Sequence, residues 1–163
     1  MDKQLKKTIV DLFADTIKFY GGDYKNRKST RSISGGKTIG AYNAKNGNKC
    51  AIARLLTNKA LKHIDESFGA KQAIDTLIRK LGPDEQVFKN KDHEEVPGHY
   101  LFRLQRLHDL EGNWDAHTGG LSIIGIRKVK EMILDLCPKH INIIYAAQEA
   151  ARCEFAEIHR EKL

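Results

Sequence analysis

The chain has 163 residues, of which 40% are hydrophobic and 30% charged, and it carries a net charge of +7. This composition is typical of a soluble globular protein, and the length suffices for one domain with its own core. No apolar run reaches the ~20 residues of a membrane span, and the start, MDKQLKKTIVDLF, lacks the apolar block of a secretory signal. We therefore expect a cytoplasmic protein without membrane contact. The three cysteines are far apart and outside any CxxC or CxxH pair, so we expect neither disulfides nor structural zinc, and no cofactor.

The first predicted element is an amphipathic helix over residues 2–20, which Gly21-Gly22 is expected to end. Its apolar face holds Leu5, Ile9, Leu12, Phe13 and Ile17. Residues 22–38 show no apolar periodicity and are predicted to form a basic mobile loop. The string Gly35-Gly36-Lys37-Thr38 is similar to the end of a phosphate-binding P-loop, but Arg31 stands where the first glycine belongs and no strand precedes it.

The positive charge is concentrated between residues 23 and 49. This stretch has seven basic residues and one acidic residue, for a net charge of +6, whereas the rest of the chain has 21 basic and 20 acidic residues. A local positive field predicts a polyanionic partner, either nucleic acid or the acidic surface of a host nucleic-acid-processing complex. A solvated basic loop is the alternative. The candidate nucleic-acid-binding residues are Lys25, Arg27, Lys28, Arg31, Lys37, Lys45 and Lys49.

An Asn46-Gly47 turn signal lies between two short segments, residues 39–43 and 48–52, and predicts a β-hairpin near residues 39–52. The remaining pattern is helical. The expected helices cover residues 51–56, 59–68 with Thr57 as N-cap, 70–81, 97–110 and 141–161, and residues 121–137 form a helix or a strand followed by a helix. The fold class is therefore mostly α, or α+β with one short hairpin, in a single compact domain over residues 1–163.

Cys50 is the first candidate for chemistry. It stands where the turn passes into the 51–56 helix, and Lys49 and Arg54 add positive potential nearby. Free N–H groups and basic neighbours stabilise a thiolate, which is the reactive form of a nucleophilic cysteine. The alternative is a small buried hydrophobe packed under the hairpin.

The second candidate is the 108–118 loop, which gathers His108, Asp109, Asp115 and His117 around the only tryptophan, Trp114. A nucleophilic cysteine needs a histidine base and a carboxylate that orients it, and this loop can supply both. No pair has the HxxxH spacing of a helical metal site. The alternative is structural, with the aspartates bounding turns and Trp114 packed on the core. We predict that Cys50 lies within reach of this loop.

The order of these motifs resembles that of small uncharacterised proteins of phages and prophages. Those proteins have a Cys-Ala-x-Gly helix start, then an Asn-Asp or His-Asp pair, then a His-Thr or Arg-Thr pair. The matching residues here are Cys50-Ala51-Ile52-Ala53, His108-Asp109 and His117-Thr118, with Ala53 in place of the usual glycine. The resemblance covers residues 39–135 and implies a phage-type origin.

Three functions follow from these patterns. The first is a phage-type accessory protein that binds nucleic acid or a host nucleic-acid-processing complex, with a host-directed or anti-defence role. The second is a hydrolase or transferase that uses Cys50 with His108 or His117 and Asp109 or Asp115. The third is an interaction module that forms a homo-oligomer through its last helix.

Overall fold

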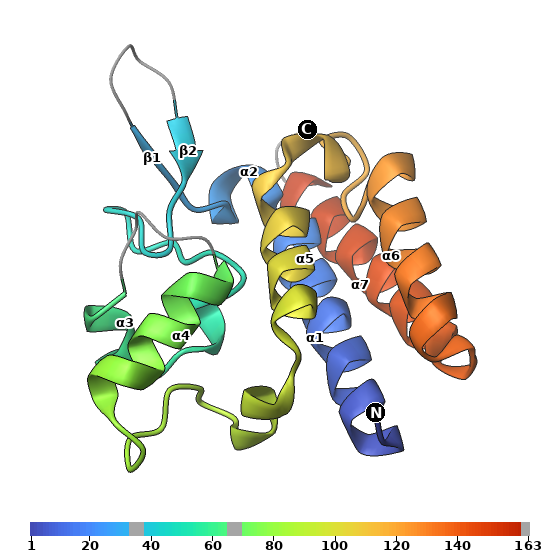
Figure 1. Cartoon of the computed structure of the whole chain (residues 1–163). Helices are drawn as coiled ribbons and strands as arrows, with labels where there is room; N and C mark the ends of the chain where they lie inside the picture. Colours follow the sequence, from blue (N-terminus) through green and yellow to red (C-terminus); the bar gives the residue numbers. More distant parts are fainter. Residues whose placement is uncertain (33–37, 65–69, 161–163) are drawn as a thin grey trace. The chain divides into compact units, whose positions relative to one another are not determined.

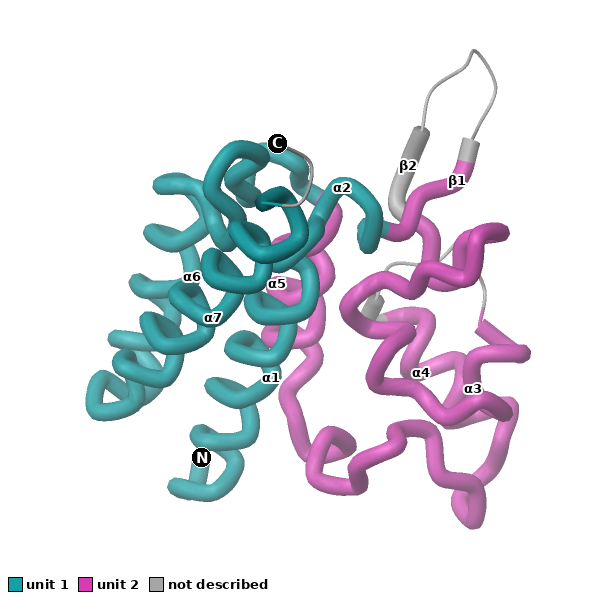
Figure 2. The backbone as a smooth tube through the Cα atoms, turned by 180° about the vertical axis from the view of Figure 1, so that it is seen from behind, with its two compact units in different colours: residues 1–28, 110–163 teal, residues 29–109 magenta. Residues whose placement is uncertain are grey.

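The structure is a computed structural model, and it describes residues 1–32, 38–64 and 70–160. The mostly α-helical fold class predicted from the sequence is confirmed (Figure 1). The backbone contacts group the chain into two compact units (Figure 2). Unit 1 joins residues 1–28 to residues 110–163, and unit 2 consists of residues 29–109. The two ends of the chain therefore fold together, and the middle of the chain forms a unit of its own.

Unit 1 is built on three long helices, α1 (Lys3–Gly22), α6 (Ile123–Leu136) and α7 (Ile141–Arg160), with short helical turns α2 (Tyr24–Arg27), η4 (Glu111–Asn113) and η5 (Pro138–His140). Helices α1 and α7 pack along one another, and α6 contacts both (Figure 1). Their facing sides are apolar, as the three-and-four spacing predicts. The fully buried side chains of this core include Ile9, Ile17, Ile133, Ile144, Ala147 and Ala151.

The two glycines expected to end α1 are its last two residues. Helix α1 runs through Gly22, and Gly21 lies where another segment comes very close. A Cβ atom on Gly21 would lie 2.8 Å from the Ala151 Cβ and 2.8 Å from the Gly120 Cα, and the Gly120 N–H donates to the Gly21 carbonyl at 2.9 Å. Gly21 therefore also serves close packing.

Unit 2 contains a two-stranded antiparallel sheet, β1 (Thr30–Ser32) with β2 (Thr38–Gly40), in which Arg31 pairs with Ile39. Helices α4 (Ala70–Leu81) and α5 (Gly98–Asp109) pack together, and the shorter helices are η2 (Ala53–Leu55), α3 (Asn58–Lys62) and η3 (Lys91–Glu95). The bounds of α4 agree with the predicted 70–81 helix. The Thr57 hydroxyl accepts from the Ala60 N–H at 3.2 Å, so the predicted N-cap of α3 is also correct.

Three local predictions differ from the structure. The basic segment 22–38, expected to be a loop, contains α2 and β1, while residues 33–37 lie outside the described ranges. The Asn46-Gly47 turn forms, with Gly47 at φ 85°, but the described residues on its two sides pair through one isolated bridge, Asn43 with Lys49, and not as two strands. The predicted 51–56 helix is the short 3₁₀ turn η2, and the 59–68 helix is described only as α3. Within the described residues, no helix is both long and apolar enough to cross a membrane.

Candidate functional site

His108 is buried at the end of α5 and is hydrogen-bonded through both ring nitrogens. Its Nε2 lies 3.3 Å from the Ser29 backbone nitrogen, and its Nδ1 lies 2.9 Å from Asp109 Oδ1. The Ser29 amide donates to Nε2, so Nδ1 carries the ring proton and donates a hydrogen bond to Asp109 Oδ1. This arrangement is satisfied by a neutral imidazole in one tautomer. The proton-accepting nitrogen of His108 is therefore engaged by the backbone.

The turn that carries Cys50 is tied to this histidine through Gln105. The Ile52 N–H donates to Gln105 Oε1 at 3.3 Å, and Gln105 Nε2 donates to Asp109 Oδ1 at 2.7 Å. Two hydrogen bonds thus connect the residue two positions after Cys50 with Asp109. These hydrogen bonds bring the turn after Cys50 beside the end of α5, within unit 2.

The Cys50 side chain is fully buried, at 0% exposure, and its sulfur lies 3.4 Å from the Ala53 nitrogen, from which it accepts a hydrogen bond. The Cys50 N–H donates to the Tyr42 carbonyl at 3.2 Å. The buried thiol therefore stabilises the turn before η2 by accepting a hydrogen bond within it. These contacts match the structural alternative considered for this residue.

In space, His108 lies between Ser29 and Asp109, as the histidine of a serine-type catalytic triad does. The Ser29 hydroxyl, however, does not face the histidine. It is the Ser29 backbone nitrogen that meets His108, while the Ser29 hydroxyl donates to the Asn48 carbonyl at 2.9 Å. Ser29 is also fully buried. A triad needs the hydroxyl to donate to the base and to face substrate. The cluster holds the start of β1 against the Asn46-Gly47 turn and α5.

Asp115 and His117 belong to unit 1, in the loop between η4 and α6. Asp115 Oδ1 accepts from the His117 and Thr118 backbone N–H groups at 2.8 and 3.0 Å. These two hydrogen bonds favour the carboxylate and hold the pKa of Asp115 below its usual value. His117 is exposed. Asp115 thus shapes a tight turn, which is the structural role considered for it above.

The basic residues fall into different environments. Arg27 forms an ion pair with Glu154 at 2.5 Å and donates to the Phe19 carbonyl at 2.6 Å, so its guanidinium holds α2 to α1 and α7. Lys28 lies 3.7 Å from Glu111. Lys25, Arg31 and Lys45 are exposed and Lys49 is half-buried, while Lys37 lies outside the described residues.

Lys25 and Lys28 line a hollow of about 520 Å³ in unit 1, which we call the α2 pocket. All its lining residues belong to unit 1 and come from α2, from η4 and the loop after it, and from the end of α7. They are Asp23, Tyr24, Lys25, Asn26, Lys28, Glu111, Trp114, Asp115, Ala116, Phe155 and His159. The volume is within the range of small-ligand sites.

Aromatic rings form much of this lining. Tyr24 stacks on Trp114, with ring centres 5.0 Å apart and planes 13° from parallel. The Phe155 and His159 rings, one turn apart on α7, are 4.1 Å apart. Lys28 Nζ lies 5.9 Å from the centre of the Tyr24 ring, so a cation accompanies the stacked pair.

Lys25, Lys28 and Asp115 are predicted site residues and Trp114 belongs to the predicted 108–118 loop, but the sequence does not indicate that these four residues line one pocket. Tyr24, Phe155 and His159 were not predicted as site residues. These three residues line the same pocket because α1 contacts α7, which brings residues 23–28 close to residues 155–159. The only local sign is that Tyr24 stands among lysines within the most basic segment.

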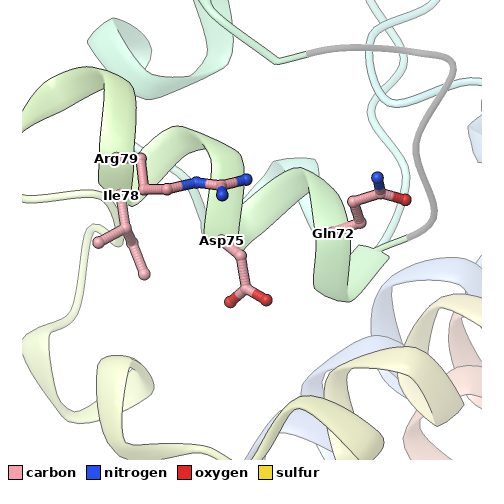
Figure 3. Close-up of a pocket in the computed structure, with 4 residues that line it drawn as sticks. All are labelled: Gln72, Asp75, Ile78 and Arg79. Atoms are coloured by element: carbon pink, nitrogen blue, oxygen red, sulfur yellow. The ribbon is translucent and has the colours of Figure 1, made fainter.

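A second hollow lies on α4, where Gln72, Asp75, Ile78 and Arg79 line a space of about 550 Å³ (Figure 3). All four side chains project from one helix, so the lining forms a single wall. Within the described ranges, no group of three or more His, Cys, Asp or Glu side chains is placed to hold a metal ion. No protein-family model, curated protein or solved structure matches this chain.

Proposed function

We propose that the protein binds single-stranded nucleic acid through its basic segment, with the α2 pocket receiving an unpaired nucleotide. The observation that carries this proposal is the combination, in one pocket, of the stacked Tyr24–Trp114 pair with Lys25 and Lys28. Proteins that bind single strands join cationic side chains, which contact phosphates, to aromatic rings, on which bases stack.

The charge distribution supports the same conclusion. Arg27 is occupied by Glu154 and serves the fold. The other described cations of the basic segment are Lys25, Lys28, Arg31, Lys45 and Lys49. The Glu111 partner of Lys28 is 81% exposed, and an ion pair in water of this kind costs little to exchange for a phosphate. A phage-type role directed at host nucleic-acid processing is consistent with such binding and is part of this proposal.

The salt dependence of binding tests the proposal. A fluorescently labelled single-stranded dodecamer, titrated with protein between 50 and 300 mM NaCl, should give a linear plot of log K against log [salt]. Five phosphate contacts predict a slope of roughly −3.5 on a single strand. Absence of binding at 50 mM NaCl, or binding that does not change with salt, would contradict the proposal.

A pair of matched variants assigns the contacts. Lys25→Ala with Lys28→Ala should weaken binding and reduce the magnitude of the slope by roughly 1.4, because two phosphate contacts are lost. The control is Lys130→Ala with Lys139→Ala, which removes the same charge from exposed positions of unit 1 outside the pocket. If both double variants weaken binding equally, the α2 pocket is not the contact surface.

The enzyme alternative stays a prediction without a supporting contact, since the Cys50 sulfur is buried and faces the Ala53 N–H. The homo-oligomer alternative also stays a prediction. Among the exposed large apolar side chains, Ile123 and Ile124 lie on α6 and Tyr145 lies on α7, the helix for which that alternative was made.

A further inference from the structure

We propose that the α2 pocket selects guanine among the unpaired bases, with the carboxylates of Glu111 and Asp115 accepting hydrogen bonds from the base edge. This inference rests on the proposed function, since it assigns the base that the nucleic-acid site reads. It addresses a feature that phosphate binding leaves unexplained, namely three carboxylates in the lining of a pocket that also holds two lysines.

The three carboxylates make different interactions. Both oxygens of Asp23 lie 3.0 Å from Asn26 Nδ2, so Asp23 is engaged within α2. Asp115 Oδ1 accepts from two backbone amides, and the Thr118 side chain also hydrogen-bonds to the carboxylate, so the carboxylate is held in one orientation. Glu111 is exposed on η4, beside Lys28. Glu111 and Asp115 thus bring negative charge into an aromatic pocket, from separate points of its lining.

An ionised carboxylate only accepts hydrogen bonds, so the base that suits it presents donors. Guanine offers N1–H and the N2 amino group side by side, which match the two oxygens of one carboxylate. Adenine and cytosine offer one amino group next to a ring acceptor. Thymine and uracil offer one N–H between two carbonyl oxygens, which a carboxylate repels. The order of preference is therefore guanine first and thymine or uracil last.

The same charges place the base and the phosphate of one nucleotide in different parts of the pocket. A phosphate placed among Glu111 and Asp115 would be repelled, whereas one beside Lys25 and Lys28 would be attracted. The base belongs against the rings and carboxylates, and the phosphate belongs at the lysines. Tyr24, fixed by its stacking on Trp114, supplies a flat surface of defined orientation for a base.

Oligonucleotides that differ in one base test the preference. Dodecamers of thymidine with a single central guanine, adenine or cytosine are compared with the all-thymidine strand by fluorescence anisotropy at 100 mM NaCl. We expect the guanine-containing strand to bind about tenfold more tightly than the all-thymidine strand, as one good bidentate contact provides. Trp114, the only tryptophan, should also be quenched more strongly by GMP than by UMP.

The variant Glu111→Gln with Asp115→Asn removes the charge but keeps an Oδ1 acceptor for the His117 and Thr118 amides. Its guanine-to-thymine affinity ratio should fall to about twofold or less. The control Glu131→Gln with Asp135→Asn removes the same charge from exposed positions on α6 and should keep the tenfold ratio.

The outcomes separate this inference from the proposal on which it rests. Salt-dependent binding of all strands with equal affinity overturns guanine selection and leaves nucleic-acid binding standing. Quenching by GMP but not UMP, without binding of any strand, overturns nucleic-acid binding and keeps the base preference. A tenfold ratio that survives in the double variant Glu111→Gln with Asp115→Asn overturns the role of the carboxylates, provided that circular dichroism shows the variant to be folded.

Discussion

Both nitrogens of the His108 ring are satisfied inside unit 2, one by the Ser29 amide and one by Asp109. Removing the ring leaves the buried Ser29 N–H without its acceptor, and an unsatisfied buried donor costs about 1–3 kcal/mol. His108 is therefore a structural residue, and its loss should destabilise the region around β1.

His108→Leu fills most of the space but has no acceptor, so we expect it to lower the free energy of unfolding by about 2–3 kcal/mol. His108→Gln carries an amide oxygen that can replace Nε2, and it should cost clearly less. Urea unfolding followed by circular dichroism measures both. Equal stability of the leucine variant and the unsubstituted protein would show that the Ser29–His108 hydrogen bond contributes nothing.

At the scale of elements, the contact between α1, α7 and the loop before α6 depends on glycine. Gly21 has the Ala151 Cβ and the Gly120 Cα at 2.8 Å from its missing side chain, and neither atom can move aside easily. A methyl group there forces the backbones apart, at a cost of about 1–3 kcal/mol that exceeds the helix-propensity gain of alanine.

Gly21→Ala should therefore lower the melting temperature by several degrees. Gly112→Ala is the matched control, because nothing lies within 4 Å of its missing Cβ and its φ is not positive. The control should melt within about a degree of the unsubstituted protein, since surface changes seldom matter. Differential scanning calorimetry of both variants measures the difference, and an unshifted Gly21→Ala transition would disprove the close packing.

The sequence predicted those elements whose determinants lie within them. Helix α4 has its own apolar stripe, α3 has Thr57 as its cap, and α7 buries Ile144, Ala147 and Ala151 as the spacing requires. The basic segment was wrongly assigned to a loop because distant contacts order it, through Tyr24 on Trp114 and Ser29 on His108. The α2 pocket escaped prediction for the same reason, since its residues come from three separate segments, 23–28, 111–116 and 155–159.

At the scale of the whole molecule, the core of unit 1 needs the last helix. Helix α7 covers the buried face of α1, which includes Ile9, Val10, Phe13 and Ile17. A chain that stops after His140 leaves that face in water. We expect such a truncated protein to bind a hydrophobic dye, to lose solubility and to melt without cooperativity.

Thermal unfolding followed by circular dichroism checks this expectation, with a synthetic peptide of residues 141–160 added back as the control. Partial recovery of the cooperative transition on addition of the peptide would attribute the defect to the missing helix. Cooperative melting of the truncated protein at the original temperature would refute the role of α7.

The joining of both chain ends in unit 1 also sets the order of events during synthesis. On the ribosome, α1 emerges first, but its partner α7 follows only after roughly 120 residues, which takes roughly 6–25 s at usual rates of translation. All of unit 2, residues 29–109, is made within that interval. During this time the apolar face of the nascent α1 has no partner helix. Molecular chaperones bind exposed apolar segments of this kind.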